Sequence, residues 1–195
     1  MTGWDGGTVF DSAKGVSLFA ADMTATEIFD SVTNGGAHDF AEVVGVLDRN
    51  KPWCLIGGLA VNCFVEPVYT MDVDLVAVTA NLEQIGRELE AAGFRLKRFE
   101  HSMNAQRRSS ELNVQFTTDA RYQDFLANAS EHEVLGIRIP VASLEDIIRG
   151  KVWALPDAER RLSKRKKDEL DLIRIAESRP DLRHLIPVEI ANQLI

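Results

Sequence analysis

The chain has 195 residues, of which 45% are hydrophobic and 27% are charged, which suits one soluble domain or one domain with a small helical appendage. The formal net charge of −8 argues against broad nonspecific binding to nucleic acid, although it leaves local basic patches open. The sequence contains neither an apolar run long enough to cross a bilayer nor a signal-type N-terminal core, so we expect a cytoplasmic protein without a membrane partner.

The N-terminal part begins with residues 1–23, which contain four glycines and scattered polar residues and predict a loosely ordered extension. A helix capped by Thr24 or Thr26 is expected next, and Asn34-Gly35-Gly36 should end it. Residues 39–48 carry apolar side chains at helical spacing and predict a second helix. We interpret both helices as structural.

Residues 52–78 carry the most informative pattern in the chain. The apolar run from Trp53 to Ile56 stops at Gly57-Gly58, which predicts a buried strand that ends in a tight turn. The apolar segment that follows predicts a helix. This helix should end before Pro67, because proline disfavours helical geometry in the residue before it. The β-branched run from Asp72 to Val78 then predicts a second strand.

Two carboxylates stand at the head of this second strand. Side chains two positions apart on a strand point the same way, so Thr70, Asp72 and Asp74 should share one face. Neighbouring carboxylates repel each other, and a pair that leads directly into an apolar strand favours a bound cation over two solvated charges, the alternative interpretation. Oxygen ligands alone favour Mg²⁺ or Mn²⁺.

The middle of the chain predicts further elements in alternation. A helix is expected over 81–92, a half-buried strand over 94–99, a polar turn over 101–110, a strand over 112–116, a helix over 119–129 and two short extended pieces between 133 and 141. On the strand over 112–116, Leu112, Val114 and Phe116 should face inward. Glu111, Asn113 and Gln115 should line its other face.

The last part of the chain predicts helices. Ser143 should cap one that Lys151 to Ala154 finish, and a long one should run from Leu162 to Ser178, with a C-terminal one over 188–195. We therefore divide the chain into an N-terminal extension (1–23), a core (24–141) and a C-terminal helical part (142–195). Basic residues crowd positions 160–167, where positive charge opposes the helix dipole, which indicates either a functional site or a solvated basic face.

These motifs, in this order, resemble the nucleotidyltransferase fold of the DNA polymerase beta superfamily. More narrowly, IGGLAVNCF followed by YTMDVDLV is similar to the AbiEii-type toxin branch, which typically has a Gly-Gly-x-Ala turn and then Arg-x-Thr-x-Asp-x-Asp. Residues 141–175 resemble the lysine and the Lys-Asp-x-x-Asp tail of that branch, so the resemblance covers about residues 50–178. Two departures stand out: Val68 replaces the arginine, and Asn113 or Gln115 occupies the usual slot of a third carboxylate.

The resemblance implies an α+β fold, with a mixed β-sheet packed with helices and a C-terminal helical part. It implies metal-dependent transfer of a nucleoside monophosphate from an NTP to an RNA such as tRNA, or to a protein, by a toxin with a cognate antitoxin. The implied site comprises Asp72 and Asp74 as metal ligands, Gly57, Gly58 and Thr70 toward the nucleotide, and Lys151, Lys167 and Asp168 as further catalytic residues.

Each of these assignments has an alternative. Gly57-Gly58 is compatible with a plain strand-to-helix turn, Thr70 with a turn residue, and Lys151 with a lysine that the helix dipole favours. Without a third carboxylate, the chain is also compatible with a degenerate nucleotide-binding or regulatory protein. A nucleotidyltransferase that modifies small molecules such as antibiotics is a third option, for which we expect a more acidic acceptor pocket and no basic run.

Overall fold

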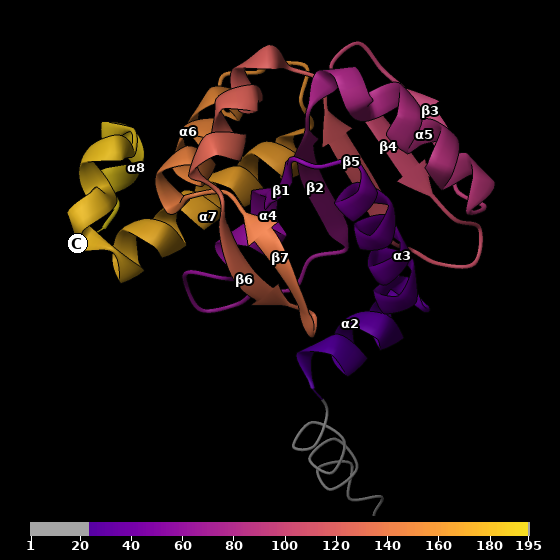
Figure 1. The fold of residues 1–195 in the computed structure, drawn as a ribbon. Helices are drawn as coiled ribbons and strands as arrows, with labels where there is room; N and C mark the ends of the chain where they lie inside the picture. Colours follow the sequence, from indigo (N-terminus) through magenta and orange to yellow (C-terminus); the bar gives the residue numbers. More distant parts are fainter. Residues whose placement is uncertain (1–23, 195) are drawn as a thin grey trace, which may run out of the picture.

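A seven-stranded mixed β-sheet forms the centre of the computed structural model, which describes residues 24–194 (Figure 1). The expected extension over 1–23 lies outside the described residues. The strands follow the order β3-β4-β5-β2-β1-β7-β6 across the sheet. Their bounds are β1 (Trp53–Ile56), β2 (Asp72–Ala77), β3 (Arg95–Arg98), β4 (Ser102–Gln106), β5 (Asn113–Thr117), β6 (Ser130–Val134) and β7 (Ile137–Val141).

The pairing of the central strands determines where the N-terminal ends of β2 and β5 lie. β2 is antiparallel to β1 and parallel to β5, whereas the outer pairs β3–β4 and β6–β7 are antiparallel. A parallel pair needs a crossover connection, and the segment between β2 and β5 supplies it. The N-terminal ends of β2 and β5 therefore lie side by side, and Asp72 pairs with Asn113 while Asp74 pairs with Gln115.

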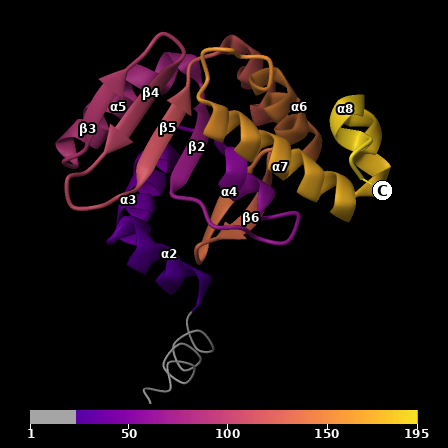
Figure 2. The same cartoon turned by 180° about the vertical axis from the view of Figure 1, so that it is seen from behind.

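Helices cover the sheet on both sides. Figure 1 shows α3 and α5 in front of the sheet, and Figure 2, from behind, shows α4 and α7 in front of it. The α-helices are α2 (Ala25–Thr33), α3 (Gly36–Arg49), α4 (Gly57–Val61), α5 (Leu82–Ala91), α6 (Leu144–Ala154), α7 (Leu162–Ser178) and α8 (Val188–Ala191). The 3₁₀ helices are η1 (Thr79–Asn81), η2 (Ala120–Asn128) and η3 (Pro180–Leu185).

Local sequence signals explain several element boundaries. Thr24 and Glu27 form a reciprocal capping box at the start of α2, and Asn34 ends this helix in the left-handed conformation. Ser143 accepts a hydrogen bond from the backbone of Asp146 and so caps α6. All four residues of β1 are buried, as expected for a strand covered on both faces. These signals were local, and the sequence predicted them correctly.

The expected α+β fold class is confirmed by this architecture, while four elements differ from the predictions. The polar turn expected over 101–110 is wrong, because β4 occupies Ser102–Gln106 and buries Met103 and Ala105 on alternate positions. The apolar segment after Gly58 is helical only to Val61. The helix expected over 119–129 is a 3₁₀ helix, and the one expected over 188–195 ends at Ala191.

None of the helices in the described part of the chain combines the length and the hydropathy that a membrane span requires.

Candidate active site

One of the two carboxylates at the start of β2, that of Asp74, lies against the glycine turn that ends β1. Asp72 and Asp74 are half-buried, and the antiparallel register pairs Asp74 with Ile56, the residue before the turn. Gly57 has a φ of +73°, and a Cβ at this position would lie 2.8 Å from Cβ and Cγ of Asp74 and would overlap its carboxylate. Gly57 is therefore required twice, once for its backbone conformation and once for the space that Asp74 occupies.

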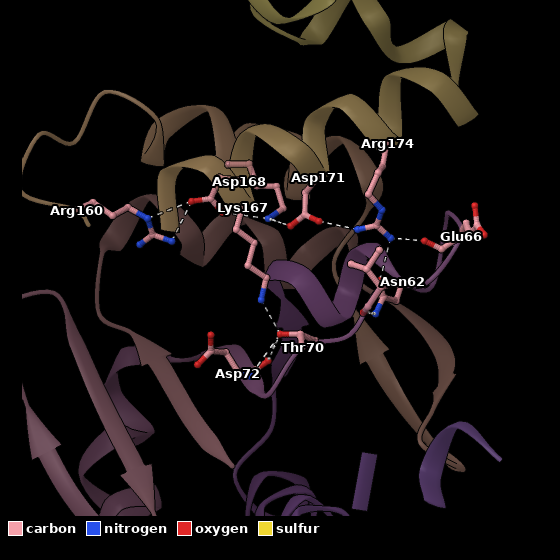
Figure 3. Close-up of polar contacts among 11 residues, drawn as sticks. Asn62, Glu66, Thr70, Asp72, Arg160, Lys167, Asp168, Asp171 and Arg174 are labelled. Carbon is pink, nitrogen blue, oxygen red and sulfur yellow. Dashed lines mark hydrogen bonds and ion pairs between the residues drawn. The ribbon is translucent and has the colours of Figure 1, made fainter. Parts of the chain in front are cut away.

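Two lysines of α7 reach across to the same place. The Nζ of Lys164 forms an ion pair with the Asp72 carboxylate. The Nζ of Lys167 donates a hydrogen bond to Thr70 Oγ1 at 2.8 Å, which Figure 3 shows. Lys167 also covers the glycine turn, because a Cβ on Gly58 would lie 3.6 Å from its Nζ. The helix thus brings two positive charges to the head of β2.

A buried chain of alternating charges holds α7 in this position (Figure 3). The Nζ of Lys151, from α6, donates to Asp168 Oδ1 at 3.1 Å and to Asp171 Oδ2 at 2.5 Å, and Lys151 is only 5% exposed. Asp168 also accepts from Arg160 Nε at 3.1 Å, and Asp171 pairs with Arg174 at 2.6 Å. Lys151 and Asp168, both expected site residues, therefore bind each other.

The far end of this chain holds the segment that leads into β2. Arg174 donates to Asn62 Oδ1 at 3.1 Å and to the carbonyl oxygen of Glu66. Asn62 in turn bonds to both the backbone N–H and the carbonyl of Val68. Residues 62–71 are thus fastened to α7 by Arg174 at one point and by the Lys167–Thr70 bond at another.

The two aspartates differ in their electrostatic surroundings. Burial, and then repulsion from Asp72, raise the pKa of Asp74 above its ordinary value, although Lys151, Lys164 and Lys167 oppose this. Burial also acts to raise the pKa of Asp72, but the hydrogen bond and charge of Lys164, together with Asn113, outweigh it and lower that pKa. Asp72 is therefore a stabilised anion, and Asp74 is a carboxylate whose charge is poorly compensated.

A cleft of about 680 Å³ opens beside this pair. Gly57, Asp74, Gln115, Lys151 and Asp168 contribute to its wall. The rest of the lining includes the aromatic residues Tyr122, Phe125 and Trp153, the acidic residues Glu100, Asp119, Asp157 and Glu159, and two arginines, Arg121 and Arg160. Such a cleft has room for a small molecule or an extended side chain next to Asp74.

An amide occupies the position at which the resemblance predicts a third carboxylate. Gln115 is level with Asp74 on the neighbouring strand and lines the cleft, whereas Asn113 is level with Asp72 and donates to its Oδ1 at 3.3 Å. Glu111 precedes β5 and is exposed, and its backbone N–H donates to the carbonyl of Thr33 at 2.7 Å. The register therefore identifies Gln115 as the residue in the position of the expected base.

The donor chemistry of Asp72 and Asp74 fits Mg²⁺ or Mn²⁺. Both ligands are hard oxygen donors, and Lys164 shows that the site accommodates positive charge against Asp72. Within residues 24–194, no group of three or more His, Cys, Asp or Glu side chains converges as a metal site. A bound Mg²⁺ would thus take its other ligands from a triphosphate and from water, as this ion commonly does.

Several residues near the site escaped the sequence-based prediction. Lys164, Asp171 and Arg174 lie three or four residues apart on one helix face together with the predicted Lys167, and this periodicity was visible in the sequence. The position of Arg160 depends on the path of the chain between α6 and α7, for which the sequence carries no comparable signal.

Comparison with solved structures identifies the fold. The antibiotic-resistance factor ANT(2'')-Ia in complex with adenylyl-2''-tobramycin matches with a TM-score of 0.55 and 15% identity, over 81% of this chain and 98% of that one. A solution structure of ANT(2'')-Ia matches with a TM-score of 0.52 and 18% identity, over 74% and 87%. The lincosamide antibiotic adenylyltransferase LnuA, bound to lincomycin, gives a TM-score of 0.48 and 12% identity, over 69% and 94%.

No protein-family model matches the chain, and no curated protein matches it by sequence. The similarity to solved structures is therefore a similarity of fold. The nucleotidyltransferase fold expected from the motifs is confirmed. Membership of the AbiEii-type branch stays a prediction.

A glycine pair tests the contact between the turn and Asp74. Gly57→Ala and Gly35→Ala both place a Cβ at positive φ, +73° and +90°, and this backbone strain should lower the free energy of unfolding by about 1–2 kcal/mol in each, with a further loss in Gly57→Ala from the clash with Asp74. A Cβ on Gly35 would have no neighbour within 4 Å, whereas one on Gly57 would displace Asp74. Only Gly57→Ala should therefore weaken binding of Mn²⁺ with a non-hydrolysable NTP, as measured by calorimetry. Equal binding by both variants would contradict the importance of this contact.

The raised pKa of Asp74 predicts an effect on stability in metal-free buffer. The folded protein retains the Asp74 proton at pH values where the unfolded chain, with a pKa of about 3.9, has lost it. The charged carboxylate therefore lowers stability increasingly as pH rises from about 4 through the folded pKa. Asp74→Asn should raise the urea midpoint at pH 7, and the exposed control Asp124→Asn should leave it nearly unchanged. A lower midpoint for Asp74→Asn would refute this account.

Proposed function

We propose that the protein transfers a nucleoside monophosphate from an NTP to an acceptor, with Mg²⁺ or Mn²⁺ held by Asp72 and Asp74. The observation that carries this proposal is the placement of Asp74 against the Gly57 turn and beside a cleft, with Lys164 of α7 on Asp72 and Lys167 on Thr70. The nucleotidyltransferase fold supports the same conclusion. The fold alone would not be sufficient evidence for this function, because proteins with the same fold can carry different activities.

The residues around the turn suit a triphosphate. Lys167 covers Gly58 and is steadied by Thr70, so its ammonium would bind the outer phosphates beside the backbone N–H groups of the turn. A metal ion between Asp72 and Asp74 would neutralise charge on the phosphoryl group during transfer. Lys151, saturated by two carboxylates, would act by positioning α7 and by its charge near Asp74.

The amide of Gln115 determines how fast we expect nucleotide transfer to be. A neutral amide cannot accept the proton of an acceptor hydroxyl, and a general base usually contributes about 10²- to 10⁴-fold to the rate. We therefore infer that transfer is slow. The alternative is a degenerate protein that binds nucleotide without transferring it, and the same amide favours that alternative.

The charge of the cleft bears on the acceptor. Both arginines of the lining, Arg121 and Arg160, are paired with aspartates, whereas Glu100, Asp157 and Glu159 have no Lys or Arg partner among the described residues. This excess of negative charge would repel an RNA backbone.

We therefore propose an acceptor other than RNA. The resemblance to AbiEii-type toxins supports tRNA or a protein as acceptor, within a toxin–antitoxin pair. The complex of ANT(2'')-Ia with adenylyl-2''-tobramycin contains a small modified molecule. Considering the acidic lining as well, we propose a protein side chain or a small hydroxylated molecule ahead of RNA.

Transfer of label tests the function. The protein is incubated with Mg²⁺ and each α-³²P-labelled NTP in turn, together with cellular RNA, protein or small-molecule fractions. We expect label to move slowly into the protein or small-molecule fraction with one or more NTPs, and Asp74→Asn to abolish the transfer. Nucleotide binding without transfer would favour the degenerate alternative, and the absence of both would refute the proposal.

Restoring an acid at position 115 tests the account of the rate. Gln115→Asp places a carboxylate level with Asp74, so single-turnover label transfer should become about 10²- to 10⁴-fold faster. The matched control is Asn113→Asp, two residues away beside Asp72, which should give no such gain. If the parent is already fast and Gln115→Asp leaves its rate unchanged, the missing base does not limit the reaction.

A further inference from the structure

The three lysines near the aspartate pair are held in different ways. Lys151 is bound by Asp168 and Asp171, and Lys167 by Thr70. Lys164 alone among them is bound by one of the candidate metal ligands, Asp72. Its side chain is 33% exposed, and that of Asp72 is 24% exposed, so this ion pair is partly open to solvent.

Both carboxylate oxygens of Asp72 already have a hydrogen-bond partner. One carboxylate oxygen, Oδ2, accepts from Lys164, and the other, Oδ1, accepts from Asn113 at 3.3 Å. A divalent cation bound to both Asp72 and Asp74 needs an oxygen of Asp72 and the space before it. An ammonium and a divalent ion cannot share that space, because both are cations that would approach the same oxygen.

We propose that Lys164 is a built-in counter-cation, which neutralises Asp72 in the metal-free protein, is displaced by the divalent metal and then binds the triphosphate that arrives with it. This inference rests on the proposed function. The backbone of α7 need not move, because the buried charges of Lys151, Asp168 and Asp171 hold the helix while the flexible lysine side chain swings.

The position of Lys164 on the helix suits its second partner. Lys164 lies three residues before Lys167, so both side chains project from one face of α7 toward the head of β2. Lys167 covers Gly58, where the outer phosphates are proposed to bind. A displaced Lys164 would thus find the phosphate oxygens within the reach of its side chain. Metal alone must expel Lys164 without this compensation, so metal and nucleotide should bind cooperatively.

Binding of Mn²⁺ with and without nucleotide tests the proposal. Lys164→Met removes the ammonium, and Lys166→Met is the matched control, because Lys166 lies on the same helix but pairs with Glu169 and is exposed. Free Mn²⁺ is measured by electron paramagnetic resonance. Without nucleotide, Lys164→Met should bind Mn²⁺ about 3- to 10-fold more tightly than wild type. With a non-hydrolysable NTP, it should bind the Mn²⁺ complex about 10-fold more weakly. Lys166→Met should change neither.

The opposite signs of these two effects separate displacement from a general change in charge. Lys164→Arg retains the competing cation, so it should bind Mn²⁺ alone no more tightly than wild type, and circular dichroism confirms that each variant is folded. Unchanged or weaker binding of Mn²⁺ alone by Lys164→Met would overturn this inference while leaving the proposed function intact. Absence of Mn²⁺ binding by wild type, with and without nucleotide, would refute the proposed function itself.

Discussion

The buried ion pairs of Lys151 with Asp168 and Asp171 are the interaction on which the geometry of the site depends. They join α6 to α7 where solvent is excluded, so removal of one partner would leave an uncompensated buried charge, which typically costs about 3–5 kcal/mol. Because Asp168 and Asp171 lie on the same face of α7 as Lys164 and Lys167, fixing the helix also fixes the two lysines over β2.

This arrangement explains why α7 carries positive charge at its N-terminal end, where the helix dipole disfavours it. Arg160 pairs with Asp168 from the preceding segment, and Lys164 pairs with Asp72 from the sheet. The unfavourable dipole interaction is thus offset by carboxylates of the same helix and of β2. The basic run is therefore divided in role: Lys164 and Lys167 face the candidate site, and Lys166 belongs to an exposed pair with Glu169.

The sequence predicted what depends on local rules and missed what depends on register. The turn after β1, the start of β2 and the caps at Thr24 and Ser143 follow from short-range preferences of individual residues. The choice between Asn113 and Gln115 needed the pairing of β2 with β5, which joins segments about forty residues apart. β4 was missed because its outward-facing residues are polar and only Met103 and Ala105 mark its buried face.

The fastening of residues 62–71 has a consequence for how a ligand would enter. Asn62, Arg174 and Lys167 already hold this segment at three places, so little conformational entropy remains to be lost there when Asp72 engages a ligand. We therefore expect the ligand to bind to a preorganised site, without ordering of a loop around it. The adjustment proposed on binding is then the rotation of the Lys164 side chain alone, and rotamer changes of exposed side chains take place in nanoseconds or less.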